Sequence, residues 1–523
     1  MERIYITTPL YYVNAEPHLG HTYTTVVADT LKRYYRSIGY DAFLLTGTDE
    51  HGDKIAHAAA ANGTEPKAYA DRVSDLFRST WDECGIAYDH FIRTTDDYHK
   101  DYVQKILQKI YDAGDIYFGE YGGLYCYGCE RFYTEKELVG GKCPDHQTVP
   151  EYISEKNYFF RMSKYQQQLI DVLQSRRDLV RPEQYRAEVL AFLREPLEDL
   201  CISRPTSRLQ WGIPLPFDSN YVTYVWFDAL LNYVSALEHR GGDLLSSLWP
   251  TANHLIAKDI LKPHAIYWPT MLMAAGLPLY QHLNVHGYWN MDSGKMSKSL
   301  GNVIRPLEMK ARFGMDAFRY FLLREMAYGQ DAKFSEEALV TRYNADLANN
   351  LGNFVSRALA MQQKYFDGVV QSLGASWTAE DQELRDKFAQ AENELKEHLK
   401  ELHFHRALEA VWSALDHANR YVVQTAPFTL IKDAGQKARV GEILYYLLEV
   451  IRTLARVLAP FMPETAVDLR DLLAVDDKGL KQEWGKGFVA GHKVNPPKVL
   501  FPRIEPLDAR AALSASIKVD VQK

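Results

Sequence analysis

Residues 9–21 read PLYYVNAEPHLGH, and this stretch decides how the N-terminal part of the chain folds. It follows the apolar run Ile4-Tyr5-Ile6, which predicts a buried strand, and it leads into a helical pattern that continues to residue 34. A strand that enters a helix through a short loop places backbone N–H groups and the positive end of the helix at one spot. We therefore predict that phosphate binds at this turn.

Two histidines, His18 and His21, lie three residues apart in the first turn of the predicted helix and therefore share a face. They could donate hydrogen bonds to a chain of phosphates without adding a full permanent charge. Gly20 has no side chain, so a flat ring can approach the backbone there. Taken alone, these residues fit an ordinary helix start with two surface histidines equally well.

A second polar stretch, Lys295-Met296-Ser297-Lys298-Ser299, carries two lysines and two hydroxyls between Gly294 and Gly301. This composition predicts a cationic loop that could close on phosphates. Most loops rich in lysine and serine are solvated surface turns, which is the alternative interpretation.

In this order and at this separation, the two stretches resemble the HIGH and KMSKS motifs of class I aminoacyl-tRNA synthetases, and those of the methionyl-tRNA synthetase family most closely. The resemblance extends from about residue 4 to about residue 465. It implies a ligase that activates methionine with ATP and Mg²⁺ and passes it to a tRNA. The residues implied in ATP binding are His18, Gly20, His21, Lys295, Ser297 and Lys298, of which His18, His21, Lys295 and Lys298 are implied in catalysis.

The composition is that of a globular protein large enough for two to four domains, with 523 residues and a net charge of −8. A negative chain has no bulk basic field, so any RNA binding must come from local patches. Five cysteines are too few for a disulfide scaffold, which fits a reducing compartment. We see no leader pattern and no run long enough to span a bilayer, and therefore expect a cytoplasmic protein that makes no membrane contact.

Residues 1–115 alternate short apolar runs with helical patterns, which predicts a parallel, doubly wound sheet. The run at residues 42–45 predicts a buried strand that ends at Thr46-Gly47-Thr48-Asp49-Glu50-His51-Gly52. Ligands of such sheets bind beyond the carboxyl ends of the strands, so we expect Tyr12, His18, His21 and Asp49 to surround one crevice. Neither a GxGxxG nor a GxxxxGK[ST] pattern occurs, which argues against a dinucleotide fold and a P-loop.

Residues 116–220 are rich in Tyr, Gly and Cys and contain Cys126-x-x-Cys129 and Cys143-x-x-His146. Two ligand pairs, each in a tight turn, can close a tetrahedral zinc site, and four protein ligands predict a structural site. Buried cysteines without metal are the alternative. His146 is the least secure ligand because Asp145 or water could replace it, and the choice of zinc over iron rests on ligand type.

Residues 221–290 contain three further strand-like runs, at residues 221–228, 254–257 and 283–287, and many aromatic residues near the predicted strand ends. Such rings suit a thioether, because sulfur packs well against ring edges, although each ring alone could be core. The resemblance implies that Asp49 pairs with the substrate ammonium and that Tyr233 and His264 close around the side chain. The full implied methionine pocket comprises Leu10, Tyr12, Asp49, Trp226, Ala229, Tyr233, Ile260, His264 and Trp268.

From residue 336 onward the pattern is almost entirely helical, which predicts a bundle of four or five helices. Asn353 and Arg357 are four residues apart on its first helix and could read base edges, although a solvated polar pair is the commoner use of this spacing. The resemblance implies that both contact a CAU anticodon and that Phe428, after Pro427, stacks on a base. The family's frequent C-terminal tRNA-binding module is not visible, so we expect a monomer.

Together these features predict an α/β protein: a split, doubly wound parallel, Rossmann-like catalytic domain with a zinc-knuckle insertion, followed by an all-α anticodon-binding bundle. The predicted segments are 1–115 and 221–290 for the catalytic halves, 116–220 for the insertion, 291–335 for the lysine loop and linker, 336–470 for the bundle, and 471–523 for a tail packing back on the body.

Several other assignments are compatible with parts of this pattern. Synthetases for leucine, isoleucine or valine need an editing insertion larger than the roughly 100 residues available here. A cysteinyl enzyme would hold zinc in its amino-acid pocket, whereas this cluster lies in the insertion. A non-catalytic tRNA-binding relative should lack one of the two signatures, and a general nucleotidyltransferase would not need Asn353, Arg357 or the bundle.

Overall fold

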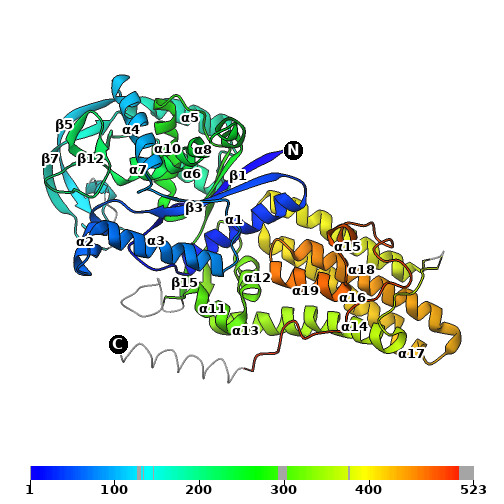
Figure 1. Cartoon of the computed structure of the whole chain (residues 1–523). Helices are drawn as coiled ribbons and strands as arrows, with labels where there is room; N and C mark the ends of the chain where they lie inside the picture. Colours follow the sequence, from blue (N-terminus) through cyan, green and yellow to red (C-terminus); the bar gives the residue numbers. More distant parts are fainter. Residues whose placement is uncertain are drawn as a thin grey trace. The chain divides into compact units, whose positions relative to one another are not determined.

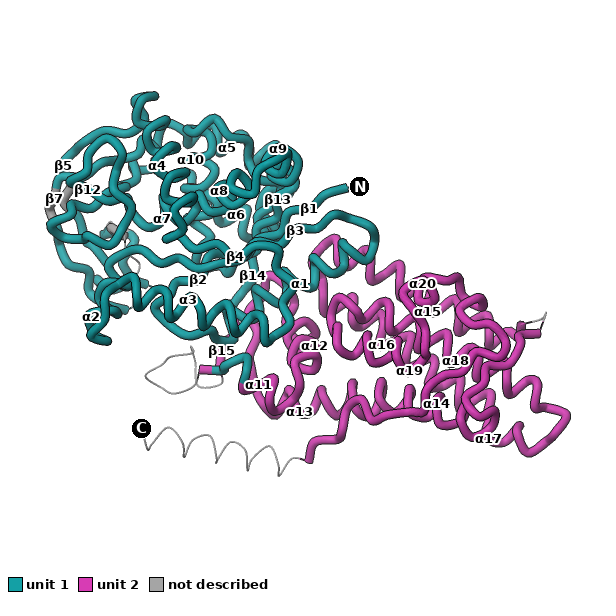
Figure 2. The backbone as a smooth tube through the Cα atoms, in the orientation of Figure 1, with its two compact units in different colours: residues 1–288, 304–307 teal, residues 289–303, 308–523 magenta. Residues whose placement is uncertain are grey.

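The computed structural model describes residues 2–126, 131–133, 135–144, 147–291, 303–374 and 377–505. The backbone divides into two compact units, shown in different colours in Figure 2. Unit 1 comprises residues 1–288 with 304–307, and unit 2 comprises residues 289–303 with 308–523. Among the described helices, none combines the length and the apolar character that a membrane crossing requires.

Unit 1 contains a seven-stranded sheet in which every pair of neighbouring strands is parallel (Figure 1). The strand order is β2-β3-β1-β13-β14-β8, and β4 pairs with the opposite edge of β3, so the predicted parallel sheet is confirmed. The strands are β1 Arg3–Thr7, β2 Tyr11–Tyr12, β3 Asp41–Asp49, β4 His90–Arg93, β8 Val180–Arg181, β13 Ala252–Ala257 and β14 His282–His286.

Helices connect these strands, as parallel pairing requires. Helix α1 (Leu19–Ser37) leads to β3, α2 (Asp53–Ala61) and α3 (Pro66–Glu83) lead from β3 to β4, and α4 (Asp97–Asp112) follows β4. Strand residues such as Leu45, Ile92, Ile256 and Val285 form one hydrophobic core with the packed helices. Because β1 and β2 follow one another along the same edge of β3, Tyr12 lies opposite Asp49.

The predicted insertion is built mainly from two antiparallel sheets. One has the order β6-β5-β7-β9 and the other the order β10-β12-β11. Their strands are β5 Ile116–Cys126, β6 Arg131–Tyr133, β7 Glu151–Phe160, β9 Leu200–Cys201, β10 Ser203–Pro205, β11 Pro214–Leu215 and β12 Asp218–Thr223. Two helices, α5 (Gln166–Ser175) and α6 (Glu183–Phe192), lie on either side of β8 in the sequence, so a short strand from this segment joins the parallel sheet.

The strand predicted at residues 221–228 is wrong in its second half. The chain leaves β12 at Thr223 and forms α7 (Val225–Leu230), which is followed by α8 (Asn232–Arg240). β12 pairs antiparallel with β10 and β11 and does not join the parallel sheet. A short apolar run does not distinguish a buried strand from a buried helix by periodicity, and this run contains both.

The segment after β13 is helical, but it is irregular. It comprises a short turn at Lys258–Ile260, a π-helical turn at Pro263–Tyr267 (η5) and α10 (Trp268–Ala274). Further short elements of unit 1 are α9 Leu244–Leu248 and single 3₁₀ turns at Glu135–Glu137, Met162–Tyr165 and Trp249–Thr251.

Unit 2 is helical, apart from the paired strands β15 (Trp289–Met291) and β16 (Ala332–Phe334) among its described residues. Helix α18 (Lys437–Leu458) is buried around most of its circumference and is therefore the central helix of the predicted bundle. The other helical elements are α11 Pro306–Phe313, α12 Met315–Glu325, α13 Glu336–Arg342, the π-helical η7 Tyr343–Gly352, α14 Asn353–Phe366, α15 Ala379–Lys400, α16 Phe404–Thr425, α17 Pro427–Leu430, α19 Pro463–Leu473 and α20 Asp477–Leu480.

The described part of the tail runs back along η7 and α14. Val494 N–H donates to the carbonyl of Gly368 at 2.9 Å, and Ile504 N–H donates to Asn344 Oδ1 at 2.9 Å. Through these contacts the described part of the tail packs against the first helical segment of the bundle.

Candidate active site

The two histidines of the first stretch lie at the start of α1, where their rings stack with centroids 3.7 Å apart. His18 Nδ1 accepts a hydrogen bond from the backbone N–H of Gly20 at 3.1 Å, and His21 Nδ1 accepts one from the N–H of His18 at 3.4 Å. A nitrogen that accepts carries no proton, so each neutral ring holds its proton on Nε2. The pair therefore presents N–H donors at the positive end of a helix.

Gly20 leaves little room for a side chain at this turn. A Cβ at this position would lie 3.2 Å from Cε1 of His18, which is tighter than nine in ten real contacts of a Cβ atom. A larger residue would therefore push the ring of His18 away from its capping position.

The predicted lysine loop, with Lys295, Ser297 and Lys298, lies outside the described residues. Just beyond it, the carbonyl of Ile304 accepts a hydrogen bond from the N–H of Leu19 at 2.9 Å, and Arg305 Nε lies 3.2 Å from a carboxylate oxygen of Glu16. The chain therefore returns from this stretch directly to the first turn of α1. Ile304 is six positions after Lys298, and a chain of that length spans at most about 20 Å, which is enough for the lysine to meet the histidines.

Asp49 is the last residue of β3 and lies at the carboxyl edge of the parallel sheet, with 6% of its surface exposed. Its carbonyl accepts a hydrogen bond from the N–H of Val13 at 3.2 Å. Tyr12, which lies opposite Asp49, donates its hydroxyl proton to the carbonyl of His51 at 3.0 Å. The structure thus joins the predicted pocket residues Tyr12 and Asp49 on neighbouring strands.

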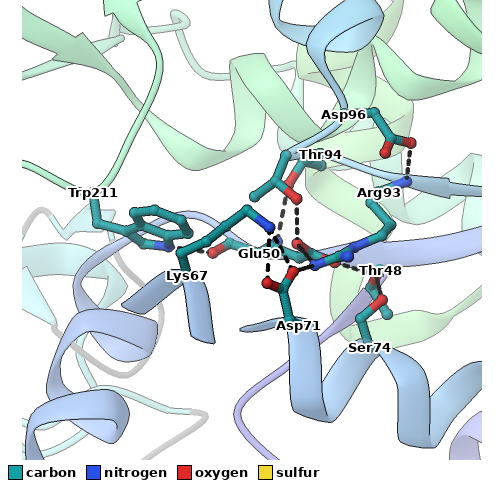
Figure 3. Close-up of polar contacts among 10 residues, drawn as sticks. Thr48, Glu50, Lys67, Asp71, Ser74, Arg93, Thr94, Asp96 and Trp211 are labelled. Atoms are coloured by element: carbon teal, nitrogen blue, oxygen red, sulfur yellow. Dashed lines mark hydrogen bonds and ion pairs between the residues drawn. The ribbon is translucent and has the colours of Figure 1, made fainter. Parts of the chain in front are cut away.

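The next residue, Glu50, has a fully buried side chain that accepts four hydrogen bonds (Figure 3). Arg93 donates from Nε to Oε1 at 2.7 Å and from its terminal nitrogen to Oε2 at 2.8 Å. The hydroxyls of Thr48 and Thr95 donate to the same two oxygens at 2.7 and 2.6 Å. Sequence analysis missed this cluster, although a charged residue next to a buried strand end could have indicated a buried ion pair.

A second buried carboxylate, Asp228 on α7, lies between two histidines. His51 Nδ1 is 2.6 Å from its Oδ2, and His99 Nε2 is 2.8 Å from its Oδ1. Burial acts to raise the pKa of Asp228, but the opposite effect of the two histidines is larger. The pKa is lowered overall, so the carboxylate remains ionised. This triad, also missed from the sequence, links the end of β3 to the helix that carries Trp226 and Ala229.

Four of the predicted pocket aromatics lie together. The ring of His264 is 5.9 Å from that of Tyr233 and meets that of Trp226 edge-on at 6.3 Å, and Tyr233 is 5.9 Å from Trp268. These four residues come from α7, α8, η5 and the start of α10. The tertiary fold thus brings into one cluster the rings that the sequence spreads over more than 40 residues.

His264 is held in one neutral form. Its Nδ1 lies 2.9 Å from the carbonyl of Ile260 and donates to it, so Nε2 accepts the hydroxyl proton of Tyr233 at 2.8 Å. Burial lowers the pKa of His264 to about 4 and raises the pKa of Tyr233 above its usual range. Both side chains are therefore uncharged at neutral pH, as binding of an apolar thioether requires.

The remaining predicted pocket residues pack against the same core. Leu10, Trp226 and Ile260 are partly buried there, whereas Ala229 is buried. His254, which the sequence did not single out, accepts a hydrogen bond at Nε2 from the indole N–H of Trp268 at 3.2 Å and therefore fixes that ring.

Two of the four predicted metal ligands can be compared with the structure. Cys126 and Cys143 are both buried in one small cluster with Tyr133, at the end of the β5–β6 hairpin and in the loop before β7. Thr148 joins them: its carbonyl accepts from the N–H of Cys143 at 2.9 Å, and its hydroxyl lies 3.8 Å from Cys126 Sγ. Cys129 and His146 lie outside the described residues. The two described thiols fit half of a Cys₃His donor set.

The other two cysteines, Cys84 and Cys201, are buried.

On the bundle, Asn353 and Phe428 are exposed, and Arg357 is partly buried on the same helix as Asn353. Arg357 donates to Oδ1 of Asn419, and Asn419 Nδ2 donates to Oδ1 of Asn350 at 2.8 Å. Asn350 Nδ2 in turn donates to Asp416 at 2.7 Å. The structure thus connects Arg357 to a polar network between η7 and α16, which the sequence did not indicate.

Two family models match the chain. The model described as class I tRNA synthetases (M) matches residues 4–150 and 145–359, and the model described as the anticodon binding domain of methionyl tRNA ligase matches residues 372–515.

Curated relatives and solved structures agree with these matches. The methionine–tRNA ligase of Caldanaerobacter subterraneus subsp. tengcongensis is 44% identical over 505 residues, which cover 96% of this chain and 79% of the relative. That of Streptomyces coelicolor is 42% identical over 523 residues, covering 96% of each chain. The Mycobacterium tuberculosis methionyl-tRNA synthetase bound by methionyl-adenylate superposes with a TM-score of 0.91 at 38% identity, covering 96% of this chain and 100% of that one.

Proposed function

The chain belongs to the methionyl-tRNA ligase family of class I tRNA synthetases, and from that premise we propose how its own residues perform the reaction. It attaches L-methionine to its tRNA at the expense of ATP, through methionyl-adenylate, and releases AMP and pyrophosphate.

The stacked pair His18 and His21 carries the proposal for adenylate formation. The methionine carboxylate attacks the α-phosphorus of ATP and pyrophosphate leaves, and no general base is needed because the carboxylate is already an anion. Catalysis then consists of positioning and of stabilising phosphate charge. The Nε2–H groups of the two rings are aimed for this task by their Nδ1 hydrogen bonds.

Lys295, Ser297 and Lys298 complete the proposed ATP site, and Mg²⁺ accompanies the nucleotide. Support for the two lysines comes from their motif and from the return of the chain to α1 at Ile304. With Lys298→Ala, methionine-dependent pyrophosphate exchange should fall far more than ATP binding. Unchanged exchange would remove this loop from the mechanism.

The proposed methionine pocket places Asp49 at the ammonium, and Tyr233, His264 and Trp268 around the thioether, with Leu10, Tyr12, Trp226, Ala229 and Ile260 as further walls. The neutral Tyr233–His264 pair supports this assignment, because charged groups would reject an apolar side chain. Sulfur also packs favourably against ring edges. Pyrophosphate exchange with each of twenty amino acids tests the specificity: methionine should give the fastest exchange, and faster exchange with another amino acid would reject the assignment.

On the bundle, we assign Asn353, Arg357 and Phe428 to the CAU anticodon. Arginine and asparagine hydrogen-bond base edges, and an exposed aromatic ring can stack on a splayed base. The exposure of Asn353 and Phe428 supports this use, because neither is needed to fill a core.

Cys126, Cys129, Cys143 and His146 would hold one structural zinc ion. With four protein ligands, the metal would cross-link the insertion and leave no open position for substrate. Metal analysis of the purified protein should find about one zinc per chain, and Cys143→Ser should lower that content. Iron instead of zinc, or no metal, would correct the assignment.

The domain boundaries 1–115, 116–220, 221–290, 291–335, 336–470 and 471–523 remain part of this proposal, as do a monomeric state and a cytoplasmic location. The small number of cysteines and their metal-ligand spacing support a reducing compartment. Light scattering of the purified protein measures the oligomeric state directly.

A further inference from the structure

The segment Asp49-Glu50-His51 is held along its backbone by groups from distant parts of unit 1. Glu50 N–H donates to the hydroxyl of Thr94 at 2.9 Å, and the Glu50 carbonyl accepts the indole N–H of Trp211. Gly52 N–H donates to the carbonyl of Trp211 at 3.2 Å, so Trp211 clamps both sides of His51. The carboxyl end of β3 is therefore fixed against β4 on one side and against the insertion on the other.

The side chains continue this fixation in two directions. Glu50 binds Arg93 on β4, whereas His51 binds Asp228 on α7. The Glu50 side chain is buried, and its four hydrogen bonds use both lone pairs of each carboxylate oxygen.

The charge of Glu50 is balanced by a chain of ions that leads to the surface (Figure 3). Arg93 also pairs with Asp71, which pairs with the exposed Lys67 one helical turn away at 2.6 Å. Burial acts to lower the pKa of Arg93, but hydrogen bonds and charges from Glu50 and Asp71 raise it overall. A buried carboxylate without this partner would move toward water, and the backbone of Asp49, the adjacent residue in the chain, would move with it.

We propose that Glu50, with Arg93, is a positioning residue that holds the Asp49 carboxylate for the ammonium group of the substrate and so makes the pocket selective for ligands that carry an amine. The inference rests on the assignment of Asp49 to the ammonium in the proposed function. Buried, doubly hydrogen-bonded ion pairs are suited to this role, because removing one member leaves the other charge uncompensated and forces the chain to move.

The variant Glu50→Gln tests this role, because it keeps the shape of the side chain but removes its charge and turns one oxygen into a donor that faces donors. Two methionine analogues report on the pocket: L-methioninol keeps the amine and lacks the carboxylate, and 4-(methylthio)butanoate keeps the carboxylate and lacks the amine. Inhibition constants are measured for both against pyrophosphate exchange.

With Glu50→Gln, we expect methioninol to bind about tenfold or more weakly, with less than about a twofold change for 4-(methylthio)butanoate. Equal weakening of both analogues, or no weakening of either, would overturn the proposal, because a merely structural role does not distinguish the amine.

Asp49→Asn separates this inference from the proposed function. It should also weaken the binding of methioninol more than that of 4-(methylthio)butanoate. If it does not, the assignment of Asp49 itself fails. If Asp49→Asn shows the selective loss and Glu50→Gln does not, only the positioning role fails.

Thr95→Val covers the case in which Glu50→Gln does not fold. It removes one hydrogen bond to Glu50 and keeps the ion pair. The binding of methioninol should therefore weaken in the same selective way, but by a smaller factor. The matched control Thr429→Val replaces an exposed threonine of unit 2 and should change neither constant. A Thr95→Val enzyme that matches this control would also overturn the proposal.

Discussion

Tyr233 and His264 in the proposed methionine pocket are 1% and 2% exposed, whereas Phe428 on the bundle is 48% exposed and Asn353 beside Arg357 is exposed as well. The polar side-chain atoms of this pair already make hydrogen bonds without substrate. The Tyr233 hydroxyl donates to His264 Nε2, and His264 Nδ1 donates to the carbonyl of Ile260. Asn353 lies on the surface, whereas Arg357 is held by a hydrogen bond to Asn419.

The difference follows from what each region is proposed to bind. Methionine is small and brings few groups, so selectivity depends on side chains that are fixed in advance and lose little entropy on binding. An anticodon loop brings splayed bases with many hydrogen-bonding edges, and exposed side chains can meet them as they arrive. Changes in the pocket should therefore affect stability and adenylate formation, and changes on the bundle should affect tRNA alone.

Removal of the Asp228 carboxylate should have the largest effect, because it leaves two buried imidazole N–H groups without an acceptor. For Asp228→Ala we expect the free energy of unfolding to fall by about 3–5 kcal/mol, with a parallel loss of pyrophosphate exchange. Urea unfolding measures the change. The control Asp97→Asn, on the exposed first turn of α4, should leave the unfolding midpoint where it is; an equally stable Asp228→Ala enzyme would contradict the assigned role.

Loss of a side chain that is proposed to read an anticodon base should have the next largest effect, and only in the tRNA step. We expect Asn353→Ala and Arg357→Ala each to raise the KM for tRNA by about tenfold to a hundredfold, the usual value of a base-edge contact. Pyrophosphate exchange should stay unchanged. Arg385→Ala, which replaces a partly exposed arginine of α15, serves as the control. Equal losses in both activities would show that the bundle face is structural.

Tyr233→Phe tests the proposed methionine pocket, the other of the two compared regions. It removes the hydroxyl that donates to His264 Nε2 and leaves the ring, so we expect about a tenfold increase in the KM for methionine and no change in the KM for tRNA. Tyr445→Phe is the matched control, since it removes a buried hydroxyl that donates to Phe488 in unit 2. If both variants change the methionine KM alike, the hydroxyl of Tyr233 has no special role in the pocket.

The smallest effect expected is that of pH on methionine binding. Because burial lowers the pKa of His264 to about 4, the ring stays neutral between pH 6 and 8, and the KM for methionine should change by less than about twofold. The same shift contributes stability that is present above about pH 6.5 and is lost as the pH falls through about 4. A methionine KM that rises steeply between pH 7.5 and 6 would show that His264 titrates.

Local features of the sequence were sufficient for much of the fold. The strands at Ile4–Ile6 and His254–Ala257 are confirmed as parts of β1 and β13, and the predicted helix start at His18 is confirmed at α1. The start of α15 follows a local rule as well: Thr378 and Asp381, three residues apart, cap it with a reciprocal pair of hydrogen bonds. Each of these depends on residues within a few positions of one another, so periodicity and capping rules apply directly.

The sequence failed where neighbours in space are distant along the chain. The apolar run after Thr223 could form a buried strand or a buried helix. Its packing in the tertiary structure decided that Val225–Leu230 is a helix. The short strand β8 joins the parallel sheet because β14 lies beside it, which no pattern around Val180 indicates.

The sequence by itself determined the family and the two signature stretches, and it supplied the residues that are proposed to bind the substrates. Tertiary structure alone decided which buried ionic contacts form near them: Arg93 with Glu50, 43 positions away, and His51 with Asp228, 177 positions away. The physical reason is that hydrogen bonds and ion pairs need contact within a few ångströms, and between such distant positions the chain's topology sets that contact.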